Sequence, residues 1–213
     1  MKNCTKDLLL GVISRYPALE GCKNDIVGAA DIIIECYNAG RKLLICGNGG
    51  SAADSLHIVG ELMKAFVLPR RLSGDIVARL NECGENAQYL TENLQGALPA
   101  ISLVNEVSLS TAYANDMAAD LGFAQQVYGL GQQDDVFIGI STSGNSKNVI
   151  YASEVAKAKG MRVIGLTGET GGKQKDVSDI TIKVPENETY KIQELHLPVY
   201  HALCLAVEYE FFG

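Results

Sequence analysis

The sequence lacks the features that mark secreted and membrane proteins. Its 213 residues include six cysteines but no C-x-x-C pair, and no apolar stretch approaches the roughly 18 residues that span a membrane. The first residues also lack the apolar segment of a signal peptide. We therefore expect reduced thiols, no disulfide framework or cysteine zinc site, no membrane partner and a cytoplasmic location.

The sequence also lacks an excess of positive charge. Its formal net charge is −7 at pH 7, from 18 lysines and arginines against 25 aspartates and glutamates. Because binding to a nucleic-acid backbone needs a basic surface, we do not expect nucleic acid as a partner. A phosphate-bearing ligand would have to be held by local hydrogen-bond donors.

Short apolar runs alternate with helix-length segments along most of the chain. This alternation predicts an α/β fold, a three-layer sandwich around a five-stranded parallel sheet, in a single domain over residues 1–213. Helices in residues 1–40, divided at Pro17 and Gly21, precede the sheet, and a helix over residues 190–212 ends the chain. The expected strands are Leu43–Cys46, Ala100–Val104, Val136–Ile140, Val163–Leu166 and Ile180–Val184.

An unusual insertion, at about residues 68–95, interrupts the alternation. It begins with Pro69-Arg70-Arg71 and continues as an amphipathic helical pattern that breaks around Gly84. A lid over a site, an interface arm and an inert insertion are all compatible with this pattern.

A glycine-rich turn, residues 47–51, follows the first expected strand and leads into a helix. Glycines permit a sharp turn, and the free N–H groups at a helix start can hold a phosphate or a hydroxyl-rich ligand. His57 and Glu61 stand at i, i+4 on that helix, a spacing that suits a metal pair or an acid–base pair. An exposed polar pair is the simpler alternative, but ligands bind where strands of open α/β sheets end, which favours a functional role.

A second polar loop, residues 141–146, follows the third expected strand and opens another helix. Its four hydroxyl side chains beside backbone N–H groups could enclose a phosphate monoester without a lysine. Helix capping is the alternative, but a cap needs only one such residue.

The last helix carries three candidate side chains. Gln193 and His196 are i, i+3 neighbours, whereas Gln193 and His201 lie about 80° apart on an ideal helix, so the helical pattern alone favours His196. Pro198 lies between the two histidines, where it removes a hydrogen bond to Glu194 and is expected to kink the axis.

Together with Ala114-Asn115-Asp116 and Ile192-Gln193-Glu194-Leu195-His196, these motifs resemble those of sugar-isomerase (SIS) domains, whose sheet is flavodoxin- or Rossmann-like. Within that group they resemble the bacterial phosphoheptose isomerases, which convert sedoheptulose 7-phosphate to D-glycero-D-manno-heptose 7-phosphate. The resemblance covers nearly the whole chain outside residues 68–95. It implies one zinc ion per subunit and a homotetramer with sites at subunit interfaces.

The resemblance also implies a role for each motif residue. The zinc ligands would be His57, Glu61, Gln193 and His201, which favours His201 over His196. Contacts to the phosphosugar would come from Asn48, Gly49, Gly50, Ser51, Glu61, Asn115, Asp116, Ser141, Thr142, Ser143, Ser146 and Gln193. Ketose–aldose interconversion moves a proton between neighbouring carbons through an enediolate, so Glu61 would be the base at carbon and His201 the group that shuttles protons between the oxygens.

Three other functions are compatible with parts of the sequence. A branch of the family acts as a non-catalytic adaptor of the replication initiator-associating type, but it lacks the acid–base glutamate and the last histidine that are present here. Residues 47–52 also satisfy the dinucleotide-binding pattern G-x-G-x-x-G/A, yet no acidic residue ends a second strand about 20 positions on. An isomerase of another phosphosugar remains open.

Overall fold

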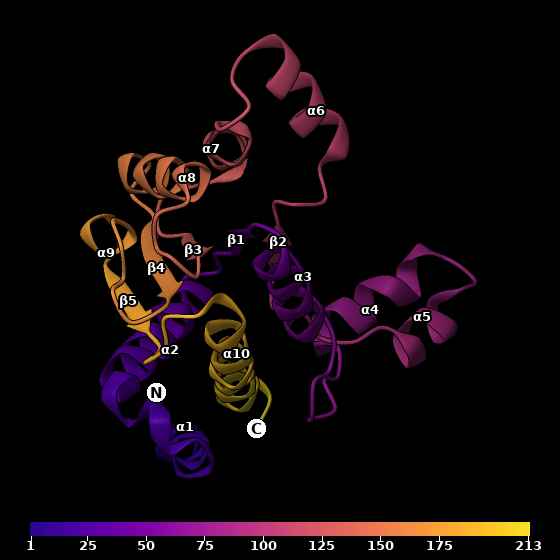
Figure 1. The fold of residues 1–213 in the computed structure, drawn as a ribbon. Helices are drawn as coiled ribbons and strands as arrows, with labels where there is room; N and C mark the ends of the chain where they lie inside the picture. The colour runs from indigo at the N-terminus through magenta and orange to yellow at the C-terminus, as the bar shows by residue number, and fades with distance from the viewer.

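Five parallel strands form the centre of the protein in the computed structural model, which describes residues 1–213 (Figure 1). Their order is β2-β1-β3-β4-β5. Every residue of β1 and β3 is buried, as expected for strands covered on both faces. The predicted fold class and all five predicted strands are confirmed. The strands are β1 Leu43–Gly47, β2 Ala100–Ser102, β3 Val136–Ile140, β4 Arg162–Thr167 and β5 Ile180–Lys183.

The alternation of side chains along the strands separates two helical layers. Leu43 and Ile45 of β1 face a core shared with α2 (Lys23–Asn38), α3 (Gly50–Met63) and α10 (Thr189–Phe212). Leu44 and Cys46 face a smaller core on the opposite side. The helices there are α7 (Gly122–Leu130) and α8 (Lys147–Ala158), while the short helix α9 (Gln174–Val177) lies between β4 and β5 in the chain.

The chain begins with the predicted helical segment. It comprises α1 (Asn3–Arg15), a 3-10 helix over Pro17–Cys22 and then α2, so the break falls at the predicted Pro17 and Gly21. Helix α1 packs on α10, which brings the two ends of the chain together (Figure 1). Helix α10 runs without interruption through Pro198, which is buried, so the proline does not divide the predicted terminal helix.

Two parts of the chain project away from the sheet (Figure 1). The insertion forms a helical hairpin of α4 (Gly74–Cys83) and α5 (Ala87–Asn93), and the predicted break at Gly84 is confirmed. Helix α6 (Val107–Asp116) projects separately. Neither α4 nor α6 contains a buried residue. No helix is long and apolar enough to cross a membrane.

The strand order fixes where a ligand site can form. The chain leaves β1 toward β2 on one side and places β3 on the other, so the carboxyl ends of β1 and β3 flank the point where the direction of winding reverses. In open α/β sheets ligands bind in the crevice at such a point. The two polar loops predicted as anion sites both lie there, one after β1 and the other after β3.

Candidate active site

A pair of asparagine side chains joins the two polar loops. The side-chain amide of Asn48 donates to Oδ1 of Asn148 at 3.0 Å, and that of Asn148 donates back to Oδ1 of Asn48 at 2.9 Å. Asn48 follows β1, whereas Asn148 lies in the first turn of α8. This reciprocal pair holds the loops as one surface across the β1–β3 crevice.

The first loop depends on two glycines. Gly49 has a φ of +56°, which favours glycine, and it precedes the first residue of α3. A side chain at Gly50 would collide with the side-chain amide of Gln193 from α10. The helix thus begins without a side chain at Gly50, while the N–H groups of Ser51, Ala52 and Ala53 donate to the Asn48 and Gly49 carbonyls within the turn.

The second loop holds its hydroxyl groups together. The hydroxyls of Ser141 and Ser146 lie 2.9 Å apart, and Oγ of Ser143 accepts the N–H of Asn145 at 3.1 Å. Ser146 is the residue before α8, but its side chain makes no capping hydrogen bond to the helix. Capping therefore does not explain this serine, whereas an anion site remains consistent with the geometry.

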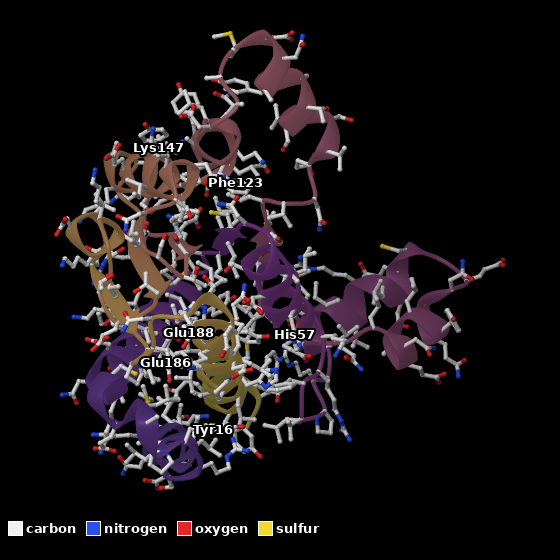
Figure 2. The ribbon with its side chains drawn as sticks, in the orientation of Figure 1. Tyr16, His57, Phe123, Lys147, Glu186 and Glu188 are labelled. Carbon is white, nitrogen blue, oxygen red and sulfur yellow. The ribbon has the colours of Figure 1, made fainter.

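A pocket of about 290 Å³ opens beside the first loop. Asn48, Gly49 and Asn148 line one side, and residues next to and within α7, including Phe123, line the other. Figure 2 labels Phe123 on the α7 side of this crevice. The pocket is large enough to receive part of a small phosphosugar.

A second group of polar side chains lies further along α3, where it packs against α10 (Figure 2). His57 Nε2 is 3.2 Å from Oε1 of Glu61 and 3.4 Å from Nε2 of His201. On the other side of its ring, His57 Nδ1 is 3.0 Å from the Tyr200 hydroxyl, which also lies 3.4 Å from Oδ1 of Asp54. Residues from α3 and α10 thus fix His57 on both sides.

The surroundings of His201 favour its neutral form. Burial lowers the pKa of His201, and the neighbouring His57 lowers it further, while Glu61 acts in the opposite direction. A neutral imidazole is the form that can accept a proton or bind a metal ion. Burial also raises the pKa of Asp54, against the opposing effects of Tyr200 and His57.

Comparison with known proteins agrees with this geometry. The SIS domain family matches residues 16–96 and 90–168. A phosphoheptose isomerase of Nitratiruptor sp. is 42% identical over 211 residues, 99% of this chain and 100% of that protein, and one of Akkermansia muciniphila is 35% identical over the full length of both. This chain belongs to the phosphoheptose isomerases of the SIS-domain family. The structure of a phosphoheptose isomerase from Neisseria gonorrhoeae superposes with a TM-score of 0.73 at 33% identity, covering 93% of this chain and 94% of that one.

Zinc, which the resemblance to phosphoheptose isomerases implies, suits the types of donor in the α3–α10 group. With bonds of about 2.0–2.1 Å, ligand atoms around tetrahedral zinc lie about 3.4 Å apart. The two contacts of His57 Nε2 with Glu61 and His201, at 3.2 and 3.4 Å, are close to that length. The cage is not closed, however, since no group of three or more histidine, cysteine, aspartate or glutamate side chains meets the geometry of a metal site.

Gln193, the fourth residue that the resemblance assigns to zinc, lies elsewhere. Its side chain packs against Gly50 at the start of α3, whereas His201 lies beside His57 two turns further along that helix. Eight residues separate Gln193 from His201, which is about 12 Å along a helix axis. Within one chain, therefore, Gln193 belongs with the phosphate loops and not with the two histidines.

The structure does not bring Asn115 and Asp116 to the loops. Both are exposed at the end of α6, and their only side-chain hydrogen bond joins them to each other at 2.8 Å. The side chain of Ser51 is buried at the start of α3, so its hydroxyl is not exposed to a ligand. The carbonyl oxygen of Thr142 accepts the Gly168 N–H, so that oxygen is already paired within the chain. The roles predicted for these residues stay predictions.

His196 lies in the core and outside the site. It is 0% exposed, and neither ring nitrogen has a hydrogen-bond partner. The structure thus places His201, which the family resemblance favours, next to His57, and leaves the residue favoured by helical spacing away from it.

Sequence reasoning missed two residues that complete the site. Asn148 could have been noted as a polar residue two positions after the second loop, although nothing in the sequence pairs it with Asn48. Tyr200 precedes His201 in an apolar stretch and reads as an ordinary core aromatic residue. Only the packing of α10 on α3 shows that its hydroxyl reaches His57.

Proposed function

We propose that this phosphoheptose isomerase interconverts sedoheptulose 7-phosphate and D-glycero-D-manno-heptose 7-phosphate. The observation that carries the proposal is that Glu61 and His201 both lie against His57. His57 and Glu61 lie on α3, the helix that begins at the glycine-rich loop proposed to hold the phosphate. A ketose–aldose isomerase needs a base at carbon and a second group at the oxygens, and these side chains supply both. A non-catalytic adaptor is disfavoured because Glu61 and His201 are both present and both lie next to His57.

In the proposed mechanism, the loops after β1 and β3 hold the phosphate and Glu61 removes the proton from the carbon beside the carbonyl. His201, kept neutral by burial, moves protons between the two oxygens of the enediolate. A base in position typically accelerates such a step about 10²–10⁴-fold, and stabilisation of the enediolate oxygens must supply the remainder. Zinc held by His57, Glu61 and His201 would act as a Lewis acid toward those oxygens.

The separation of Gln193 from His201 supports a site shared between subunits. We infer a homotetramer in which the partner's Gln193 completes the group formed by His57, Glu61 and His201. Ile76 of α4, Tyr89 of α5 and Met117, the residue after α6, are 44%, 68% and 72% exposed, which also suits a chain that assembles. The insertion would then be an interface arm.

Turnover tests the proposed reaction directly. The purified protein is incubated with sedoheptulose 7-phosphate, with and without added zinc, and the product is followed by NMR. We expect conversion to the heptose 7-phosphate, and Glu61→Gln should abolish it while leaving phosphosugar binding largely intact. If the protein converts only a shorter ketose phosphate, the assignment of sedoheptulose 7-phosphate as its substrate is wrong. If it converts no sugar phosphate, a non-catalytic adaptor role is favoured.

Mixing two inactive variants tests the shared site. Gln193→Ala and His57→Ala are each expected to be inactive, and co-expression should restore part of the activity because some sites then receive both intact residues. Light scattering should give four times the chain mass of 22.8 kDa. Absence of restored activity in confirmed mixed tetramers would show that each site uses one chain only.

A further inference from the structure

The last turn of α3 carries Glu61, and a side chain holds the end of this turn. The carbonyls of Glu61 and Leu62 accept hydrogen bonds from Nη2 and Nη1 of Arg70, at 2.9 and 2.6 Å. The N–H of Ala65, which would reach the Glu61 carbonyl if the helix continued, donates instead to Oε1 of Gln95 at 2.8 Å. A guanidinium group therefore takes the place of the next helical turn.

The Arg70 side chain is itself fixed by α10. It is 0% exposed, its Nε lies 2.8 Å from Oε1 of Glu208, and its guanidinium lies over the ring of Phe212, 4.9 Å from the centroid. A guanidinium group presents its donors in a rigid planar fork, so contacts on three of its nitrogens fix both its position and its orientation. Its charge also suits the C-terminal end of a helix, where the dipole favours a cation. Arg70 therefore connects the end of α3 to α10.

The Glu208 carboxylate also holds the segment that connects α3 to α4 (Figure 1), which we call the connecting segment (residues 64–70). It accepts three successive backbone N–H groups at 2.8, 2.8 and 3.1 Å, those of Phe66, Val67 and Leu68. The ring of Phe66 lies against His201, with centroids 5.6 Å apart. The buried pair thus reaches both proposed reacting residues, Glu61 through its backbone and His201 through Phe66.

We propose that Arg70 is a positioning residue, which fixes the Glu61 carboxylate beside His57 by holding the last turn of α3. This role rests on the proposed function, since it takes Glu61 as the base at carbon. The Glu61 carboxylate lies 3.2 Å from Nε2 of His57, and this contact requires the last turn to keep its conformation. Misplacement of a reacting group by about 1 Å, caused by a change far from the chemistry, can lower the rate about 100-fold.

Arg70→Lys removes the planar fork and keeps the positive charge. A lysine ammonium cannot contact the carboxylate and both carbonyls in the same arrangement, so the end of α3 should loosen. Asp135→Asn is the matched control, because Asp135 is also 0% exposed and pairs with Lys42 Nζ at 2.6 Å. It precedes β3, at the edge of the sheet opposite the polar loops, so its loss should lower stability without moving Glu61.

The first measurement is turnover of sedoheptulose 7-phosphate, at a temperature where circular dichroism shows all three proteins folded. We expect kcat to fall about 100-fold in Arg70→Lys, with an unchanged KM. The KM should hold because Glu61 lies eleven residues after Gly50, about 16 Å along the helix axis from the phosphate loop. In Asp135→Asn both constants should stay unchanged, whereas a merely structural role of Arg70 would give the two variants the same kcat.

The second measurement, amide hydrogen exchange read by mass spectrometry, needs no turnover. The connecting segment contains no helix or strand, and Val67 within it is 58% exposed. The amides that donate to Glu208 should nevertheless exchange slowly in the unaltered protein, because the buried carboxylate holds them. The peptide that covers the last turn of α3 should exchange faster in Arg70→Lys and not in Asp135→Asn.

Fast exchange of the connecting segment in the unaltered protein would overturn the proposal, and this result needs no variant to fold. An unchanged kcat in Arg70→Lys, or an equal loss of kcat in Asp135→Asn, would also overturn it. If exchange behaves as expected but the unaltered protein converts no sugar phosphate, the proposed function fails, and Arg70 still holds the end of α3.

Discussion

Replacing Glu208 by glutamine should strongly destabilise the protein, because this carboxylate organises a buried polar group. It accepts the backbone N–H groups of Phe66, Val67 and Leu68 at 2.8, 2.8 and 3.1 Å and the Nε–H of Arg70 at 2.8 Å. The side chains of Glu208 and Arg70 are both 0% exposed. The segment that leaves α3 is thereby tied to α10.

The expected magnitude follows from the buried charge that remains in the variant. Arg70 also donates to the carbonyls of Leu62 and Glu61, at 2.6 and 2.9 Å, which lie in the last turn of α3. Removing one partner of a buried ion pair costs about 3–5 kcal/mol because the other charge stays buried without compensation. In a protein of this size each kcal/mol lowers Tm by about 2–4 °C, so Glu208→Gln should lower Tm by about 6–20 °C.

Thermal and urea unfolding provide the measurement, with Glu188→Gln as the control. Glu188 forms an exposed pair with Lys191, and exposed pairs contribute about 0–1 kcal/mol. A Tm loss in Glu208→Gln no larger than that of the control would refute the reasoning, since it would mean that the buried guanidinium of Arg70 finds other compensation.

The pH dependence of the same comparison gives a second check. Burial acts to raise the pKa of Glu208, but the three amides and Arg70 outweigh it, and the pKa lies below its ordinary value of 4.5. A depressed carboxyl pKa contributes stability above the unfolded-state pKa, and this stability is lost as the pH falls through the folded-state pKa. The difference between the unaltered protein and Glu208→Gln should therefore shrink below about pH 4.

Two further predictions concern the second loop and the core. Ser146→Ala should weaken phosphosugar binding about 10-fold or more in calorimetry, because a hydrogen bond to a charged group contributes about 1.5–3 kcal/mol. The control is Ser14→Ala, at an exposed serine. Equal affinity in the two variants would show that the phosphate binds away from Ser146. Burial lowers the pKa of His196 to about 4, against a smaller opposing effect of the Thr167 backbone. The unfolded chain therefore binds a proton that the folded protein does not, and the free energy of unfolding should fall by about 2 kcal/mol between pH 7 and pH 5. His196→Leu should remove most of that loss, and an unchanged pH dependence would show that other groups cause it.

Local features of the sequence predicted the fold well. The strands are short apolar runs bounded by polar turns, and their alternation with helices leaves few arrangements other than a parallel sheet. The break of the inserted helices at Gly84 and the division of the first helices at Pro17 were also predictable, because glycine and proline affect the backbone near their own position. The insertion was recognisable as helical, although its lack of buried side chains in α4 was not.

The candidate site was predicted in part. Spacing on one helix places His57 beside Glu61 whatever the remainder of the chain does, and glycine turns after strands predict anion sites through backbone geometry alone. Helical spacing on the last helix favoured His196, however, and the structure buries that side chain. The family resemblance, which draws on the whole set of motifs, pointed to His201.

The sequence by itself determined the elements, their order in the chain and the residues that share one helix face, because these depend on neighbours within a few positions. Only the tertiary structure decided which faces meet. Asn48 with Asn148, Arg70 with Glu208 and Tyr200 with His57 are separated by 100, 138 and 143 positions. Their contacts depend on the rotation and depth of α10 against α3 and on the distance between two strand ends, which packing of the whole core sets and no local pattern records.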